Sequence, residues 1–451
     1  MTTTATAEEL ELLQDEAVRF TRELIRIDTS NYGTGDPQTW GPGEHAAAEY
    51  VAELLREVGY APQLLGPEPT RTSVVLRVAG EDPDRGGLVI HGHLDVVPAR
   101  AEDWSVDPFA ADVIDGMLYG RGAVDMKDMD GMILAVLRHL ARTGRKPPRD
   151  LVVVFFADEE AGGLYGSLWM TREHPEIFSG CTEAISEVGG YSITLPHAGS
   201  GDPVRAYLVQ TAEKGYAWGR LIAHGRAGHG SVRTDENAIV RLATAIAAID
   251  QHVFPTEFVD SVRTLFDRVS EITGVVWDPE DPESFLPLLG GARQFVGATL
   301  QDTANVTMLS AGYKRNVVPQ TAEAMLDCRI LPGHDEDLLA LIEDLIGEHV
   351  ELVIDQRSSA VQSPAAAPLV SRMHEAVQAE DPGAHLLPYC LSGGTDNKPL
   401  AELGITGYGF VPLQLPADLD FAPLFHGVDE RVPLEAIRFG SRVLLRLVGN
   451  C

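Results

Sequence analysis

Cysteine is scarce in this chain of 451 residues, and the few cysteines lie far apart. The four are Cys181, Cys328, Cys390 and Cys451, and no two of them form a CxxC pair. This spacing offers neither a disulfide framework nor a thiolate zinc site. Any metal site must therefore be built from histidine and carboxylate side chains.

Positive charge and long apolar runs are also in short supply. The 35 lysines and arginines are outnumbered by 67 acidic residues, which gives a net charge of -32. Without a basic stripe, a general affinity for nucleic acid or anionic membrane is excluded. No apolar run is long enough to span a bilayer, and the first twenty residues lack the pattern of a signal peptide. We therefore predict a cytoplasmic protein with no nucleic-acid or membrane partner.

The hydrophobic content of 44% is enough for a large core, and the length favours two domains. Thr6 and Glu9 have capping-box spacing, and apolar residues then recur at intervals of three and four, which predicts an amphipathic helix. Further helices are expected over 44–57, 128–141, 237–253 and 336–348, and after Pro433. Short apolar runs such as "SVVLRVA", "GLVIHGH" and "LVVVFF" alternate with them. This alternation predicts an α/β fold with a mostly parallel central sheet and helices on both faces.

The pattern changes after Asp202, where "VRAYLVQTAEKGYAWGRLIAHG" predicts a long hairpin of half-buried strands. Two more strands are expected at "NVTMLS" and "EAMLDCRI", and "WDPEDPESFLP" is expected to be a mobile loop. After "LPGHDED" the strand and helix alternation returns. We therefore expect a smaller α+β domain at 202–333, inserted into a larger domain formed by 1–201 and 334–451.

Polar side chains gather at the ends of the predicted parallel strands, where an α/β sheet usually places its site. His91, His93 and Asp95 follow "GLVI" at alternating positions, and period-two geometry alone does not decide which of them binds a metal. Glu159 and Glu160 follow "LVVVFF". One of these neighbours can ligate a metal while the other takes a proton from the attacking water. An oxygen-and-nitrogen site suits zinc, cobalt or manganese, and an acid-rich one can hold two ions.

Eight motifs, taken in order, resemble those of the M20 family of metallopeptidases. They are "HGHLDVVP", "GRGAVDMKDMDG", "DEEAGG", "SEVGG", "GRAGHGS", "DCRILPG", "SGGTDN" and "FHGVDERV". The family includes glutamate carboxypeptidases, aminoacylases, acetylornithine deacetylases, succinyl-diaminopimelate desuccinylases and dipeptidases. The resemblance implies a zinc-peptidase-like catalytic domain with an inserted lid and dimerisation domain.

The same resemblance implies a site for two divalent ions, zinc first, with cobalt or manganese as alternatives. The ligands that it implies are His93, Asp125, Glu160, Glu187 and His426. Asp125 would bridge the two ions, with His93 and Glu187 on one of them and Glu160 and His426 on the other.

Two further residues beside the ligands receive roles from the resemblance. Asp95 would orient His93 from behind, as carboxylates beside ligating imidazoles do. Glu159 would be the general base, and His91 would only pack or hydrogen-bond. A cis peptide bond is implied after Asp125.

Substrate contacts are implied for three other motifs, and Asn305, outside the motifs, is a further candidate. His229 would stabilise the oxyanion, and in dimeric members this histidine comes from the partner subunit, which would make a homodimer through the inserted domain necessary. Arg329 would bind a substrate carboxylate, because its planar fork matches two oxygens. Asn305 could add a donor, and the backbone of Gly393 and Gly394 would approach the same carboxylate.

These features predict a dinuclear metal-dependent hydrolase that cleaves an amide bond in a small carboxylate-bearing substrate. A dipeptide, a C-terminal residue and an N-acyl amino acid all fit that description. Two alternatives stay open: a deacylase of an N-acylated biosynthetic intermediate, and a non-catalytic protein that binds a peptide or amino acid on the same fold. The complete ligand set and base favour the enzyme, because a binding protein has no chemical need of Glu159.

Overall fold

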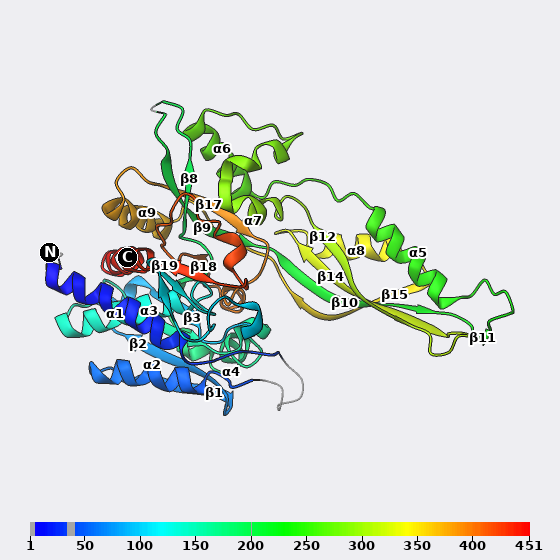
Figure 1. Ribbon diagram of the computed structural model, residues 1–451, viewed down its shortest axis with the longest axis horizontal. Helices are drawn as coiled ribbons and strands as arrows, with labels where there is room; N and C mark the ends of the chain where they lie inside the picture. Colours follow the sequence, from blue (N-terminus) through cyan, green and yellow to red (C-terminus); the bar gives the residue numbers. More distant parts are fainter. Residues whose placement is uncertain (1–4, 34–40, 200) are drawn as a thin grey trace.

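The computed structural model describes residues 5–33, 41–199 and 201–451. Within them, a large body is built on a ten-stranded sheet, and a narrower extension leads away from it (Figure 1). The strands of the large sheet are β1 (Gln63–Glu68), β2 (Arg71–Val78), β3 (Gly87–His93), β6 (Leu151–Phe156), β7 (Cys181–Ser186), β8 (Ser192–Leu195), β9 (Val204–Glu213), β16 (Val361–Gln362), β17 (His385–Leu391) and β18 (Thr406–Gly409). Its centre, in the order β6-β3-β7-β18, is parallel, and antiparallel strands flank it. The predicted mostly parallel central sheet is confirmed.

Helices cover both faces of the large sheet, as predicted. One face carries α1 (Ala7–Ile25), α2 (His45–Glu57), α3 (Lys127–Thr143), α9 (Pro368–Glu380) and α11 (Leu434–Val448), and the other carries α4 (Ser167–Glu173) and α10 (Asn397–Glu402). Alternating residues of β3 explain this: Leu88 and Ile90 point into the first core and Val89 into the second. The capping box at the start of α1 is present. In the described part of the chain, no helix combines the length and apolarity needed to cross a membrane.

The extension is a four-stranded antiparallel sheet with helices on one face. Its strands are β10 (Gly215–His224), β12 (Thr303–Ala311), β14 (Thr321–Ile330) and β15 (Val350–Ser358), in the order β12-β14-β10-β15. Alternate residues such as Leu221 and Leu326 are buried against α5 (Ala238–Gln251) and α8 (Asp335–Ile346), which leaves the other face of the sheet open. The short strands β11 (Gly228–His229) and β13 (Val317–Val318) pair at the far tip (Figure 1).

The long hairpin predicted from Val204 to His224 is wrong. β9 pairs with β17 in the large sheet, while β10 pairs with β14 and β15 in the small one. The chain runs from one sheet into the other through Lys214, whose backbone N–H donates to the Leu391 carbonyl. A side chain on Gly215 would come within 2.7 Å of the Ala360 backbone, because the two connections between the sheets pass side by side there.

The small sheet also extends beyond the predicted range 202–333. The helix and strand after residue 334, which were expected in the large domain, are α8 and β15 of the small sheet. Conversely, α6 (Asp260–Thr273) and α7 (Arg293–Gly297) pack into the core of the large body. The segment between them, predicted to be a mobile loop, forms short 3-10 turns with Phe285, Leu286 and Leu289 buried. Apolar side chains within this acidic stretch explain the difference.

Candidate metal centre

The predicted ligands meet at one edge of the large sheet, because parallel strands end on the same side. His93 is the last residue of β3, Glu160 lies in the turn after β6, and Glu187 directly follows β7. Asp125 precedes α3. His426 comes from the loop ahead of β19 (Arg431–Pro433).

Asp125 lies between the two histidines, with one carboxylate oxygen toward each. His93 Nε2 is 3.0 Å from Asp125 Oδ1 and 3.4 Å from Glu187 Oε2. His426 Nε2 is 3.2 Å from Asp125 Oδ2 and 3.1 Å from Glu160 Oε2. The five side chains therefore form two half-sites that share Asp125. Donor atoms of His93, Asp125 and Glu160 also lie within 4.8 Å of one another, as do those of His93, Glu159 and Glu187.

The charges of this cluster call for cations. Burial raises the pKa of Glu187 to about 8, and burial together with Glu187 raises the pKa of Glu159 well above its usual range. Burial would lower the pKa of His93, but Glu187 and Asp125 raise it well above the ordinary value. Hydrogen bonds to Asp125 and Glu160 raise the pKa of His426 to about 11. The crowded carboxylates therefore favour positive charge at both histidines. Histidine nitrogens and carboxylate oxygens are donors that fit zinc, cobalt or manganese.

The contact expected between Asp95 and His93 is made by the backbone. His93 Nδ1 lies 2.9 Å from the carbonyl oxygen of Asp95 and 3.7 Å from its carboxylate. The carboxylate instead accepts the backbone N–H groups of Glu159, at 3.1 Å, and Glu160, at 3.0 Å. Asp95 thus holds both the imidazole and the turn that carries the two glutamates.

Behind Asp95 lies a buried chain of polar side chains that the sequence did not reveal. The amide nitrogen of Asn31 donates to Asp95, at 2.8 Å, and to Asp158, at 3.0 Å. The oxygen of the same amide accepts from Arg71, which also pairs with Glu44. These partners are up to 127 residues apart in the sequence, so no local spacing could have indicated them.

Two more buried carboxylates hold functional loops, and sequence analysis gave neither a role. Glu430 accepts the backbone N–H groups of Gly122, Val124 and Asp125 and pairs with Arg121. Glu213 accepts from the backbone and the hydroxyl of Thr395, in the glycine-rich loop. A carboxylate that accepts several backbone N–H groups restrains a loop without any regular secondary structure.

His91 has the packing and hydrogen-bonding position expected of it. Its ring nitrogens lie 3.0 Å from Asn397 Oδ1 and 3.1 Å from Ser186 Oγ. Burial lowers the pKa of His91 to about 4, which keeps the ring neutral. The peptide bond between Asp125 and Met126 is cis, as the resemblance implies.

The residues expected to bind substrate divide into near and far groups. Gly393 and Gly394 follow β17 in a loop that lies beside Glu159: burial is the main cause of its raised pKa, and Asp396 of this loop adds to it. Arg329 lies on the open face of the small sheet, where Asp327 accepts from it at 2.8 Å. The glycine-rich loop is thus the nearer of the two to the cluster, and Arg329 lies beyond it, 5.9 Å from the ring of Tyr216.

His229 and Asn305 lie away from the cluster within this chain. His229 is exposed on β11, at the far tip of the extension, where it hydrogen-bonds with Ser231 (Figure 1). Asn305 is on β12, the outer strand of the small sheet, and lines a groove between β12 and α5. One chain therefore does not bring either residue to its own metal cluster.

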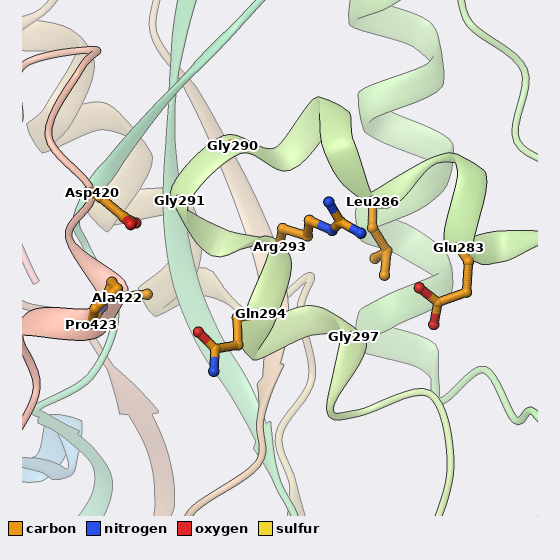
Figure 2. Close-up of a pocket in the computed structure, with 10 residues that line it drawn as sticks. All are labelled: Glu283, Leu286, Gly290, Gly291, Arg293, Gln294, Gly297, Asp420, Ala422 and Pro423. Atoms are coloured by element: carbon orange, nitrogen blue, oxygen red, sulfur yellow. The ribbon is translucent and has the colours of Figure 1, made fainter.

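A surface pocket lies beside the loop that leads to His426. Its volume is about 400 Å³, and Figure 2 shows Arg293 and Gln294 on one side of it and Asp420 with Pro423 on the other. It contains none of the predicted ligands. The wall with Arg293 and Gln294 packs against the loop that carries His426, because the rings of Phe295 and Phe425 are 5.6 Å apart.

Known proteins are similar to this chain over most of its length. N-fatty-acyl-amino acid synthase/hydrolase PM20D1 of Xenopus tropicalis is 27% identical over 457 aligned residues, which cover 96% of this chain and 86% of the relative. Aminoacylase-1 of Homo sapiens is 27% identical, with 90% of each chain covered.

Solved structures share the fold over almost the whole chain. An M20 family metallo-carboxypeptidase from Sulfolobus solfataricus, Sso-CP2, superposes with a TM-score of 0.71 at 17% identity and covers 96% of this chain and 99% of its own. Human carnosine dipeptidase 1 gives a TM-score of 0.68 at 14% identity, with 98% and 97% covered. A sequence model of peptidase family M20/M25/M40 matches residues 89–450. The chain therefore belongs to peptidase family M20/M25/M40 and is a hydrolytic enzyme of that family.

Proposed function

We propose that the protein is a dinuclear metal-dependent hydrolase that cleaves an amide bond in a small substrate with a free carboxylate. The observation that carries this proposal is the position of Asp125, whose two oxygens face His93 and His426 separately. His93, Asp125 and Glu187 would hold one ion, and Asp125, Glu160 and His426 the other. Zinc fits the donors best, with cobalt or manganese as alternatives. When bound, the ions would polarise the amide carbonyl and acidify the attacking water.

Glu159 is the general base in this proposal. It lies in the same turn as the ligand Glu160, and burial raises its pKa, which suits a group that must accept and then release a proton near neutral pH. It would take a proton from the attacking water and pass it to the departing amine nitrogen. Asp95 fixes the backbone of this turn and the ring of His93.

The proposed substrate class rests on the carboxylate-binding residues and on the relatives. Arg329 presents a guanidinium on the open face of the small sheet, and Gly393 and Gly394 would offer backbone N–H groups from the loop that also carries Asp396, a neighbour of Glu159. The similar proteins include an aminoacylase, an N-fatty-acyl-amino acid synthase/hydrolase and a dipeptidase. A dipeptide, a C-terminal residue or an N-acyl amino acid would satisfy both observations.

We also propose a homodimer formed through the small sheet and α5. A groove of about 640 Å³ between α5 and β12 is lined largely by apolar residues; Leu309 in its lining is 67% exposed, and Val240 beside it on α5 is 59% exposed. Pairing through this surface would let His229 of one subunit serve the cluster of the other, with Asn305 at the contact. A cytoplasmic location would suit the four cysteines, all of which are free.

The proposal is tested by replacing Glu159 with glutamine in protein reloaded with zinc, cobalt or manganese. The amide has nearly the same shape but accepts no proton, so turnover should fall about 10²- to 10⁴-fold. Bound metal, measured by mass spectrometry of the native protein, should stay at two ions per chain. Glu402→Gln, on the surface of α10, is the matched control and should retain full activity. Full turnover of Glu159→Gln on dipeptides and N-acyl amino acids would contradict the role of this residue.

A further inference from the structure

The open face of the small sheet carries two neighbouring aromatic residues at its base, next to the large body. Tyr216 and Trp218 lie two positions apart on β10, so both point away from α5 and α8. Across the strand pair, Tyr216 is opposite Arg329 and Trp218 is opposite Asp327. The proposed carboxylate-binding arginine therefore shares its face with both rings.

The two rings and the guanidinium form one continuous surface. The ring centroids of Tyr216 and Trp218 are 4.7 Å apart, with 32° between the ring planes. The Arg329 guanidinium carbon lies 5.9 Å from each ring centroid. Trp218 is 38% exposed, so this large apolar ring is not needed to fill the core of the sheet. An exposed aromatic surface of this kind is typical of a binding site.

This surface faces the loops of the metal centre. The Tyr216 hydroxyl accepts from Gln356 Nε2 at 2.9 Å, and the same nitrogen would be 3.3 Å from a side chain placed on Gly162, in the turn after Glu160. On its other side, Tyr216 lies 5.4 Å from Lys398 Nζ, which would be 2.8 Å from a side chain on Gly394. Tyr216 thus stands between the turn that carries the base and the glycine-rich loop.

Asp327 holds Arg329 without blocking it. Its carboxylate accepts from Nε at 2.8 Å and from Nη2 at 3.1 Å, on one edge of the guanidinium. The Nη1 edge is left for a second carboxylate. A substrate bound there would carry its side chain over the neighbouring rings, because that side chain branches from the carbon that bears the carboxylate.

We propose that Tyr216 and Trp218 form a specificity wall that selects substrates whose carboxylate-bearing residue has a large apolar or aromatic side chain. This inference rests on the proposed function and adds the substrate class. Stacked rings favour flat or apolar groups over charged or very small ones. Substrates that differ in the apolar group they place against such a surface differ in kcat/KM about ten- to a hundredfold. N-acyl phenylalanine or leucine would therefore be preferred to N-acyl glycine or aspartate.

The test compares N-acetyl-phenylalanine and N-acetyl-glycine as substrates of the metal-loaded, full-length enzyme. The parent should favour the phenylalanine substrate, and Trp218→Ala should reduce the ratio of the two kcat/KM values about tenfold or more. Trp218→Phe, which keeps a ring, should recover most of that ratio. The matched control is Arg220→Ala, further along the same face of β10 and paired with Asp355, which should leave the ratio unchanged.

A second measurement separates this inference from the proposed function. Titration calorimetry of both N-acetyl amino acids with Glu159→Gln, which should bind them without cleavage, reports binding free of the heat of hydrolysis, and the same preference for the phenylalanine compound, through Trp218, is expected. If nothing is hydrolysed but this preference is present, the proposed function fails and the wall stands. If neither assay shows this preference, or if Trp218→Ala and Arg220→Ala change it equally, the wall is overturned.

Discussion

The metal centre and the tip of the small sheet carry functional residues under opposite conditions. At the metal centre His93, Asp125 and Glu187 are almost fully buried, and buried carboxylates hold the loops around them. At the tip, His229 is exposed and its side chain hydrogen-bonds only within its own turn, to Ser231, in the described structure. The predicted ligands of the first region meet within one chain, whereas His229 lies away from them, so under the proposed function it would serve another subunit. Catalysis under the proposed function needs both.

The largest effect is expected for His229→Ala, which tests whether the exposed tip takes part in catalysis. If this imidazole stabilises the oxyanion of a neighbouring subunit, its loss should lower kcat about 10²- to 10³-fold, the usual cost of one oxyanion donor. Bound metal should not change, because no predicted ligand lies near β11. Single-turnover kinetics with metal analysis of the same sample checks both statements.

Mixing two inactive variants tells a neighbour's histidine from the chain's own. His229→Ala and Glu159→Gln subunits, denatured and refolded together, should regain roughly a quarter of parental activity, because each mixed dimer then has one site with both groups. No recovery, although mixed dimers are present by native mass spectrometry, would mean that His229 serves its own chain.

The next largest effect is expected on removing the metals. Without cations, the crowded carboxylates around Asp125 repel one another, so the loops that carry Glu160 and Glu187 should open more often. When free metal is at about 100 times its dissociation constant, it stabilises the closed loops by about 2.7 kcal/mol. Its removal should therefore raise the population of open loops roughly 100-fold. Hydrogen exchange of residues 157–163 and 187–190, which form these two loops, should therefore accelerate when a chelator is added.

The small sheet should show no such response. Exchange in β12 and β14 should stay within about twofold, because these strands contain none of the predicted ligands. Asp125→Asn, which lacks the bridging carboxylate, should exchange rapidly with or without added metal. If chelation accelerated hydrogen exchange equally in both sheets, the effect of the metals would not be local to the metal centre.

The same contrast explains which residues the sequence could predict. His93 ends its parallel strand, and Glu160 and Glu187 follow theirs within four residues, so the sheet brings the three together and ordered motifs point to them. Glu213 and Glu430 act through backbone N–H groups of loops more than 180 residues away. Nothing in the local pattern of either residue indicates such a contact, because the fold alone brings the two segments together.

The assignment of strands to sheets failed for a related reason. β9 and β10 follow each other as two long strands with turn residues between them, which suggests a hairpin, but in the structure only Lys214 separates them. Whether two such strands pair with each other depends on the competing partners, which here are β17 for one strand and β14 and β15 for the other. Sequence periodicity describes one strand at a time and does not contain that competition.

The smallest of these effects is expected at Asn31, which tests whether the metal centre also depends on the buried residues behind its ligands. Asn31→Ala removes the amide that donates to both Asp95 and Asp158, two carboxylates within the same buried network. The turn with Glu159 should lose part of its support, and kcat should fall about tenfold with KM and bound metal unchanged, as for other residues that orient ligands from behind. Asn450→Ala, at the end of α11, is the matched control. If kcat falls for Asn31→Ala but not for Asn450→Ala, and KM stays the same, then the order of the turn contributes to the rate in addition to the ligands. Equal kcat for the two variants would mean that Asn31 has only a structural role.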